Sequence, residues 1–173
     1  MKLDQIRKRT AYDANSLPTQ KQATRTWLSS KSSEYPLALT LTLKQAITQN
    51  TAFGTHKRCI TRSDCERIAQ RFIQKLNKEI FGNSAKRHNK SLKYLVVVEG
   101  ERTFKQLHLH MAIGDLPKHV RFNEFDSLVK KAKIRVEEID TQHKVDIADS
   151  GWMDYITKEL GTKDTENVLW NLA

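Results

Sequence analysis

Two short groups of residues in this chain could do chemistry together. His108-Leu109-His110 has the pattern of a β-strand that places both imidazoles on one face, about 6–7 Å apart along the strand. Tyr155 and Lys158 begin 45 residues after His110, and they share one face if that segment is helical. The histidines could share a divalent metal ion, while the second group supplies a nucleophile and a cation. Together they are the equipment for cleaving a phosphodiester through a phosphotyrosine intermediate.

The first half of the chain predicts one strand and one long helix. Residues 37–43 alternate strictly, which predicts a strand with its leucines in the core and its threonines on the opposite face. Residues 44–62 are interpreted as a loop. Ser63-Asp64-Cys65-Glu66 has the form of a capping box and predicts a helix to about Phe81, ended by Gly82. The predicted buried face of this helix consists of Ile68, Phe72, Ile73, Leu76 and Ile80.

The second half predicts the elements that carry the two chemical groups. Two strands, residues 92–101 and 105–113, are separated by a short turn, which predicts an antiparallel hairpin. Asn123 is expected to cap a second helix, and residues 134–148 to form a strand pair with Ile134, Val136, Val145 and Ile147 inward. A third helix over residues 151–160 would carry the tyrosine. This order predicts an α+β fold, with an antiparallel sheet and helices packed on one face.

The charge of the chain is unevenly distributed. Residues 1–93 hold 19 Lys and Arg against 6 Asp and Glu, a balance of +13, whereas residues 94–173 have a balance of −3. A basic half beside a mildly acidic half indicates a polyanionic partner and a site that gathers metal. Residues 1–33 are predicted to be a basic N-terminal arm, flexible or ordered on binding, and residues 34–173 to form one domain.

Two further observations bear on the cellular setting. No run approaches the eighteen apolar residues of a membrane span, and the N-terminus has no apolar signal-peptide core. We therefore expect an intracellular, cytoplasmic protein with no membrane partner. Cys59 and Cys65 are the only cysteines, so a disulfide scaffold is not indicated. His56 lies close to both, but no second pair of ligands has the spacing of a zinc site.

Two basic groups are candidates for binding DNA. One is a polar loop before the strand that carries Glu99, which is expected to lie at the rim of the site. The other is a stripe along the long helix, although such stripes are usually only solvated surface. The loop candidates are Lys86, Arg87 and Lys90, and the second choices on the helix are Arg67, Arg71 and Lys75.

The order of three blocks in the chain resembles the HUH endonucleases of the rolling-circle replication initiator (Rep) class, in their single-tyrosine form. The blocks are Leu39-Thr40-Leu41-Thr42-Leu43, then His108-Leu109-His110, then Tyr155-x-x-Lys158 followed by Glu159. The resemblance covers roughly residues 36–160. It implies a central, about five-stranded antiparallel sheet with flanking helices, which presents the histidines beside the tyrosine helix.

The resemblance also implies an activity. The enzyme would nick single-stranded DNA at a specific site, form a 5′-phosphotyrosine bond with Tyr155, and rejoin strands by the reverse step. It would thereby start rolling-circle replication of a plasmid or phage. Glu99 lies nine residues before His108, where Rep proteins often place a third, acidic metal ligand. Two imidazoles and one carboxylate suit manganese or magnesium, and Lys158 could stabilise phenolate or the scissile phosphate.

The implied partner is single-stranded DNA from a replication origin or stem-loop. The chain lacks a Gly-x-x-x-x-Gly-Lys-[Ser/Thr] phosphate loop, so any helicase would be a separate host protein. Each site residue also has an ordinary structural explanation, such as a half-exposed histidine, a surface carboxylate or a packed tyrosine. Two other functions stay open: a single-tyrosine transposase of the same superfamily, and a non-catalytic nucleic-acid-binding α+β domain.

Overall fold

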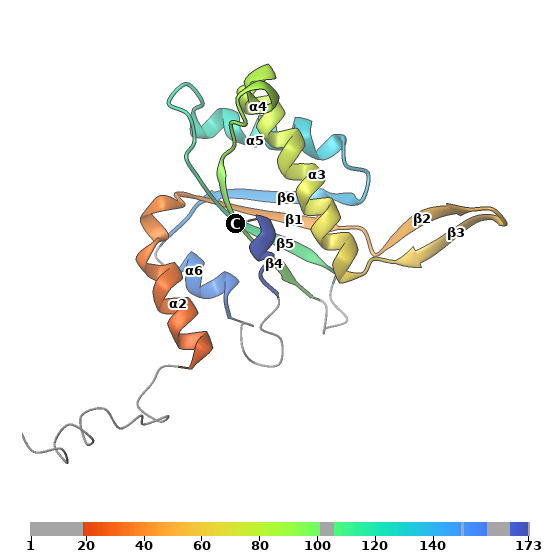
Figure 1. Ribbon diagram of the computed structural model, residues 1–173, viewed down its shortest axis with the longest axis horizontal. Helices are drawn as coiled ribbons and strands as arrows, with labels where there is room; N and C mark the ends of the chain where they lie inside the picture. The colour runs from red at the N-terminus through yellow and green to blue at the C-terminus, as the bar shows by residue number, and fades with distance from the viewer. Residues whose placement is uncertain (1–18, 101–105, 150, 159–166, 173) are drawn as a thin grey trace, which may run out of the picture.

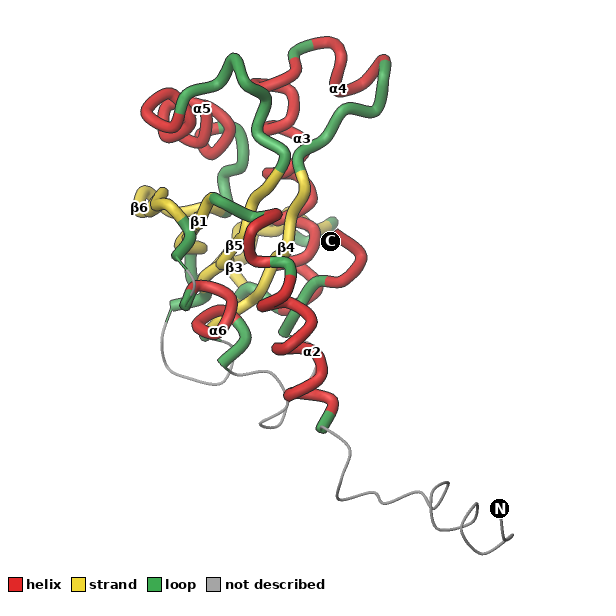
Figure 2. The backbone as a smooth tube through the Cα atoms, turned by 90° about the vertical axis from the view of Figure 1, so that its left-hand side faces the viewer, coloured by secondary structure: helices red, strands yellow, loops and turns green. Residues whose placement is uncertain are grey.

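One antiparallel sheet between two layers of helices forms the body of the molecule (Figures 1 and 2). The computed structural model describes residues 19–100, 106–149, 151–158 and 167–172. The α+β class and the antiparallel sheet with flanking helices are confirmed. None of the helices in these ranges is long and apolar enough to cross a membrane.

The sheet has four strands in the order β4-β5-β1-β6, and every neighbouring pair is antiparallel. Its strands are β1 (Leu37–Leu43), β4 (Lys93–Glu99), β5 (His108–Gly114) and β6 (Ile139–Ile147). The expected β4–β5 pairing is confirmed, with Glu99 opposite His108; the connecting turn predicted near residues 102–104 lies outside the described residues. β1 occupies a central position, so the first strand of the domain is flanked by β5 and β6, which come much later in the chain.

The sheet therefore has four full strands in the described part of the chain, rather than about five. The free edge of β4 is nevertheless covered by a short C-terminal segment. Val168 forms an isolated antiparallel bridge with Val97, and the Val98 amide donates a hydrogen bond to the Asn167 carbonyl at 2.8 Å. This single bridge occupies the position that a fifth strand would take, and it satisfies part of the exposed edge of β4.

Helices cover both faces of the sheet, so the prediction of one covered face is wrong. α3 (Arg62–Phe81) and α5 (Phe122–Ile134) pack on the face that carries the leucines of β1. α2 (Gln20–Ser30) and α6 (Trp152–Ile156) lie on the opposite side, as Figure 2 shows. The second layer is needed because that face also carries apolar side chains, and these would otherwise face water. This second core consists of Leu28, Leu95, Val97, Ala112, Met153, Ile156 and Val168.

The helix ends differ from the predictions by one or two residues. α3 begins at Arg62 with Thr61 as its cap, because the Thr61 amide and hydroxyl both donate hydrogen bonds to the Asp64 carboxylate. α5 begins at Phe122 after Arg121, not at Asn123. Gly82 ends α3 as predicted, and its φ of +56° is one that residues with a side chain rarely adopt.

Three predicted segments have a different structure. Residues 44–62 contain a second, two-stranded sheet of β2 (Ala46–Thr51) and β3 (Gly54–Cys59). Its outer half is exposed on both faces, so it lacks the apolar alternation that predicts a strand. Residues 134–148 form only one strand, β6, instead of a strand pair, and Ile134 and Ile147 are exposed. Part of the predicted N-terminal arm is helix α2, whose Leu28 is fully buried; residues 1–18 lie outside the described residues.

Three short helical turns complete the described structure. The chain turns through η1 (Ser32–Glu34) before β1, α4 (Asn83–Arg87) after α3, and η2 (Trp170–Leu172) at the C-terminal end. The tyrosine helix α6 ends at Ile156 in the structure, and most of its predicted continuation lies outside the described residues.

A buried carboxylate joins the small hairpin to α3. Asp64 is 5% exposed and accepts hydrogen bonds from Arg58 at 2.5 and 2.9 Å and from Arg67 at 3.1 Å. The adjacent Arg58 guanidinium, with help from Thr61 and Arg67, holds the pKa of Asp64 well below its usual range even though burial acts in the opposite direction. The same carboxylate also caps α3, so one side chain fixes the helix start and the hairpin base.

We predict that Asp64→Asn destabilises the protein by about 2 kcal/mol, because it removes the charge of a cap and of a buried ion pair. The lowered pKa means that the wild-type advantage is present above the unfolded-chain value near 3.9 and is lost as the pH falls below it. Urea unfolding at pH 7 and at pH 3 measures this difference. Asp146→Asn, at an exposed ion pair with Lys144, is the matched control and should leave stability unchanged. An equal loss at both pH values would contradict the electrostatic explanation.

Candidate active site

The strand alternation places the two histidines on the face opposite the leucine core. His108 and His110 come from β5, and Glu99 comes from the end of the neighbouring β4, directly opposite His108. Thr40 of β1 lies opposite His110 on the other side. Because Leu109 and Met111 bury the other face of β5, the histidines cannot turn inward without exposing that core. The sheet thus fixes the direction of all of these side chains.

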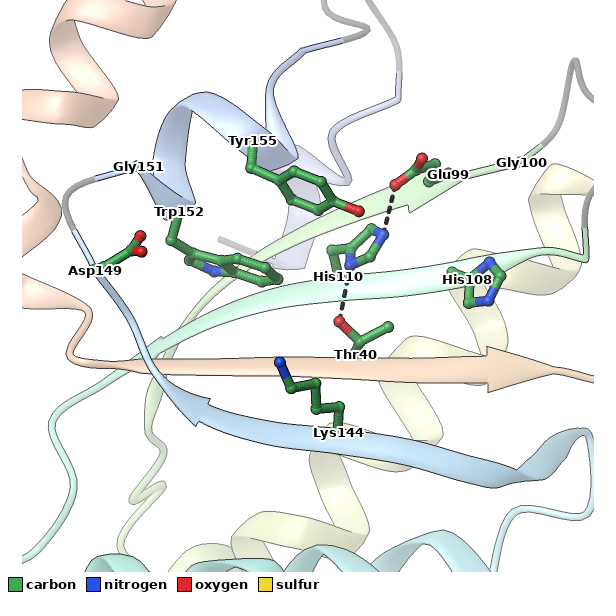
Figure 3. Close-up of a pocket in the computed structure, with 10 residues that line it drawn as sticks. All are labelled: Thr40, Glu99, Gly100, His108, His110, Lys144, Asp149, Gly151, Trp152 and Tyr155. Atoms are coloured by element: carbon green, nitrogen blue, oxygen red, sulfur yellow. Dashed lines mark hydrogen bonds and ion pairs between the residues drawn. The ribbon is translucent and has the colours of Figure 1, made fainter.

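Helix α6 brings the tyrosine to this face. A pocket of about 650 Å³ lies between the sheet and the helix. In Figure 3 the Tyr155 ring extends from α6 over the strands, with its hydroxyl toward His110 and Glu99. The pocket is lined by Thr40, Glu99, Gly100, His108, His110, Lys144, Asp149, Gly151, Trp152 and Tyr155. Residues separated by more than a hundred positions in the chain therefore share one cavity.

His110 is the most constrained side chain of the site. It is 5% exposed, and its Nε2 lies 2.6 Å from Glu99 Oε2 while its Nδ1 lies 3.0 Å from the Thr40 hydroxyl. Because a carboxylate can only accept, Nε2 carries the proton, and in the neutral ring Nδ1 accepts from Thr40. Burial lowers the pKa of His110, and the charge of Glu99 opposes this without reversing it. The resting imidazole is therefore neutral, with its orientation held on both sides.

Glu99 also contacts the cation next to the tyrosine. Its Oε1 lies 2.7 Å from Lys158 Nζ, so the two carboxylate oxygens contact two different partners. Burial raises the pKa of Glu99, but Lys158 and His110 outweigh it and the pKa is lowered. Burial likewise opposes the charge of Lys158, yet Glu99 and Tyr155 raise its pKa overall. Both groups are therefore ionised at neutral pH.

Tyr155 combines an accessible phenol with a fixed ring. The residue is 45% exposed, and its ring stacks on Trp152 with centroids 5.5 Å apart. The edge-on contact with His110 has a centroid distance of 5.4 Å, and Lys158 Nζ lies 4.0 Å from the centre of the Tyr155 ring. A cation this close favours the phenolate over the phenol. The tyrosine is thus held in place without being covered.

The side chains have the right chemistry for a metal ion but do not converge on one. Among the described residues, no three His, Cys, Asp or Glu side chains are grouped as metal ligands. Glu99 and His110 touch through a shared proton, and the ring of His108 is 6.1 Å from that of His110. An ion would have to replace the proton between Glu99 and His110, and His108 would have to turn toward it. Two nitrogens and one carboxylate are suitable donors for manganese or magnesium once that happens.

The basic groups predicted to bind DNA do not lie at this pocket. The segment with Lys86, Arg87 and Lys90 precedes β4, whereas Glu99 ends it, and six strand residues separate the two ends by about 20 Å. The expectation that this loop lies at the rim of the site is therefore wrong. The stripe with Arg67 and Arg71 is on α3, which covers the other face of the sheet.

Two of the stripe arginines already have a structural role. Arg67 and Arg71 both contact the buried carboxylate of Glu138, at 3.2 and 2.6 Å. Lys75 lies one turn further along α3 and is half-buried. These arginines neutralise a carboxylate that would be costly to leave unpaired, which explains the basic stripe without DNA.

Four pocket residues were not among the sequence candidates. Thr40 was predicted to face away from the core, and that signal could have identified it as a neighbour of the histidines. Lys144 enters because β6 pairs with β1 in a register that places it opposite Thr40. Trp152 is three residues before Tyr155 on the same helix face, and that spacing was available from the sequence. Asp149 lies just before α6, and no local pattern marks it.

A family comparison agrees with this arrangement. The family model for replication-associated proteins of the ORF2 type matches residues 36–163, about three quarters of the chain. The chain belongs to this family. The matched range contains every residue of the pocket. Membership of this replication-associated family links the chain to DNA replication and its initiation, and nuclease activity is usual among such Rep proteins. No curated protein and no solved structure matched the chain.

We predict that Thr40→Val lowers the free energy of unfolding by about 1 kcal/mol, because it leaves the buried Nδ1 of His110 without a donor. Thr42→Val is a matched control on the same face of β1, since the Thr42 hydroxyl makes no hydrogen bond to the described residues. Chemical denaturation of the two variants measures the difference. Equal stability of both variants would show that the Thr40 contact does not hold His110.

Proposed function

We propose that this member of the replication-associated protein family is a single-tyrosine HUH endonuclease that nicks and rejoins single-stranded DNA at a replication origin. The observation that carries the proposal is the contact of four chemical groups at one pocket wall. Tyr155, Lys158, Glu99 and His110 come from the helix and two strands, and each contacts at least one of the others. A merely structural tyrosine would not need an ionised lysine and a paired histidine around an exposed phenol.

The reaction is a transfer of one phosphodiester bond. The Tyr155 oxygen attacks the phosphorus, its bond to the 3′-oxygen breaks, and the DNA keeps a free 3′-hydroxyl while its 5′-phosphate stays on the tyrosine. The phenol proton leaves as the new bond forms, and the departing 3′-oxygen takes up a proton. Because one ester replaces another, the step is readily reversed, and a 3′-hydroxyl that attacks the phosphotyrosine rejoins the strand.

Lys158 addresses the main obstacle to this step. A phenol has a pKa near 10 and is mostly protonated at neutral pH, so it is a weak nucleophile without help. The protonated Lys158 lies over the ring and stabilises negative charge on the phenol oxygen. Its ion pair with Glu99 keeps the ammonium in this place. Trp152 holds the ring from the other side, so the oxygen is directed into the pocket.

We further propose that His108, His110 and Glu99 hold a manganese or magnesium ion when DNA is bound. Such an ion would polarise a non-bridging oxygen of the scissile phosphate. Binding requires Glu99 and His110 to give up their shared proton, and Thr40 keeps the His110 ring in the correct plane while they do so. The phosphate itself brings charge that favours this exchange.

The cis arrangement of the pocket favours a replication nuclease over a transposase that exchanges tyrosine helices between two chains. Tyr155 contacts His110 of its own chain, so no second copy is needed to complete the site. A separate helicase would open the origin duplex. Contacts of DNA with Lys86, Arg87 and Lys90, or with Arg67, Arg71 and Lys75, stay predictions, although neither group lies at the pocket.

The first test concerns the nucleophile. Tyr155→Phe should abolish the covalent protein–DNA adduct and leave the fold intact, because it removes one hydroxyl and keeps the ring on Trp152. A denaturing gel of protein incubated with a single-stranded DNA library and manganese detects the adduct. Tyr35→Phe is the control and should form it normally. DNA attached to another tyrosine in peptide mapping would overturn the assignment.

The second test concerns the metal. His108→Ala or His110→Ala should weaken manganese binding at least 10-fold, measured by isothermal titration in the presence of uncleavable DNA, because each removes one of three ligands. Excess chelator should stop cleavage while DNA binding largely survives, since phosphate contacts dominate affinity. His119→Ala, at an exposed loop position, should behave like the wild type. Full cleavage in excess chelator would exclude a required metal.

The third test concerns the supporting charge. Lys158→Ala should slow single-turnover cleavage by roughly 10–1000-fold, the range expected when one preorganised electrostatic donor is removed. Substrate affinity should change much less, because Lys158 acts on the reacting atoms. Lys118→Ala, an exposed lysine away from the pocket, is the matched control. An unchanged rate would make Lys158 an ordinary surface lysine.

A further inference from the structure

The β2–β3 hairpin has no role in the site described above, although it is the most exposed element of the described chain. It projects away from the body of the molecule at the right of Figure 1. Residues 48–57 are ten consecutive exposed positions. Phe53, at the tip, is fully exposed, which is unusual for a large apolar side chain. A folded ribbon that buries nothing over half of its length invites a partner.

The charge of the ribbon identifies the kind of partner. Residues 35–63 contain no Asp or Glu, although the chain has 20 in all. Lys44, Lys57 and Arg58 are the cations of the ribbon and its base, and its other exposed side chains are mainly hydrogen-bonding ones. The amides and hydroxyls are Thr48, Gln49, Asn50, Thr51 and Thr55. Cations without anions, combined with amides and hydroxyls, match a nucleic acid that offers phosphates and base edges.

The ribbon is held in a fixed direction from its base. Arg58 of β3 donates to Gln49 of β2 and also forms the ion pair with the buried Asp64 of α3. Ile47 packs against the main core on the same side. Toward the tip, the Thr55 hydroxyl donates to Asn50 Oδ1 at 2.8 Å, which ties the two strands together. The ribbon is therefore an organised arm, and less ordering entropy is lost when it binds.

The ribbon leaves the sheet at the end that carries the reactive residues. Thr42 lies opposite His108, and the next residue, Leu43, donates its amide to the Leu107 carbonyl at 2.8 Å. β2 begins only three residues after Leu43. Glu137 and Glu138 share a hollow of about 260 Å³ with Lys44 and Lys57 at the base of the ribbon. The outer half is thus the part that carries no acidic neighbour on its own strands.

We infer that the β2–β3 hairpin binds double-stranded DNA in the major groove, next to the single strand that enters the pocket. This inference rests on the proposed nicking function and adds the second half of its substrate, a junction between duplex and single strand. Two strands about 4.8 Å apart with their side chains fit a groove about 12 Å wide, and a two-stranded ribbon is one of the shapes that this groove admits. Phe53 at the tip would contact a thymine methyl group or the edge of the duplex.

Duplex fits better than a second single strand. Single strands are gripped by several aromatic rings on which successive bases stack, whereas Phe53 is the single Phe, Tyr or Trp between Lys44 and Cys59. The exposed amides of Gln49 and Asn50 are of the type that pairs with adenine in the major groove. The ribbon offers hydrogen bonds and charge along its length, which is what a stacked duplex can use.

The test is a shortened hairpin. Replacing residues 50–55 by Asn-Gly joins the paired residues Gln49 and His56 through a two-residue turn and keeps the base of the ribbon. Both this variant and its parent carry Tyr155→Phe, so only binding is measured. The probes are a 20-base-pair duplex with a 12-nucleotide single-stranded tail, and the same tailed strand without its complement, with fluorescence anisotropy as the readout. We expect the shortened hairpin to weaken binding of the tailed duplex at least 10-fold and of the single strand less than 2-fold.

A single substitution keeps the test independent of the deletion. Lys57→Ala should reduce the slope of log affinity against log salt for the tailed duplex by about 0.9, the value for one lost phosphate contact on duplex DNA. Lys131→Ala on α5 is an exposed matched control and should leave the slope unchanged. Equal binding of the tailed duplex by the parent and the shortened variant would overturn the inference.

Other outcomes have clear meanings. A shortened variant that binds DNA normally but loses a dimer in light scattering would assign the ribbon to a protein contact, and the inference would fail. Wild-type protein that forms no covalent adduct with any single strand would remove the proposed nicking function, while hairpin-dependent duplex binding would still be observed. The two proposals can therefore fail separately.

Discussion

The site depends on one carboxylate that contacts two elements at once. Glu99, at the end of β4, holds His110 of β5 through one oxygen and Lys158, just after α6, through the other. If this bridge were absent, the sheet and the tyrosine helix would be joined there mainly by apolar contacts, which do not fix side-chain direction. The bridge sets the place of the ammonium beside the phenol and the tautomer of the histidine. It is also the contact that a metal ion would have to rearrange.

This arrangement is possible because the sheet is buried on both faces. β5 carries Leu109 and Met111 on one face and the histidines on the other, so each strand serves both a core and a site. The second helical layer covers only part of the reactive face. Its apolar contacts end near Met153 and Ile156, and beyond them the pocket opens. The Arg25 contact with Asp154 at 3.3 Å adds a link between α2 and α6. The tyrosine helix is thus supported from behind and open in front.

The basic charge of the chain has more than one use. Arg67 and Arg71 balance the buried Glu138, and Arg58 balances the buried Asp64. These cations stabilise the fold and are not free to bind phosphate. The ribbon from Thr48 to Lys57, by contrast, is exposed throughout and has no acidic residue. A count of charges along the sequence treats both groups alike, whereas pairing in the fold separates structural cations from those available to a polyanion.

The sequence by itself determined the class of fold, the strands that carry the chemistry and the faces of His108, His110 and Glu99. These follow from local alternation and capping, which act over a few residues. It did not determine the ribbon at 46–59, the second helical layer with α2, or the exact start of α3. Nor could it show that Lys86 lies at the wrong end of β4 or that Thr40, Lys144 and Trp152 line the pocket. Such facts depend on strand order and register, and those are decided by contacts between residues far apart in the chain, which leave no periodic signal.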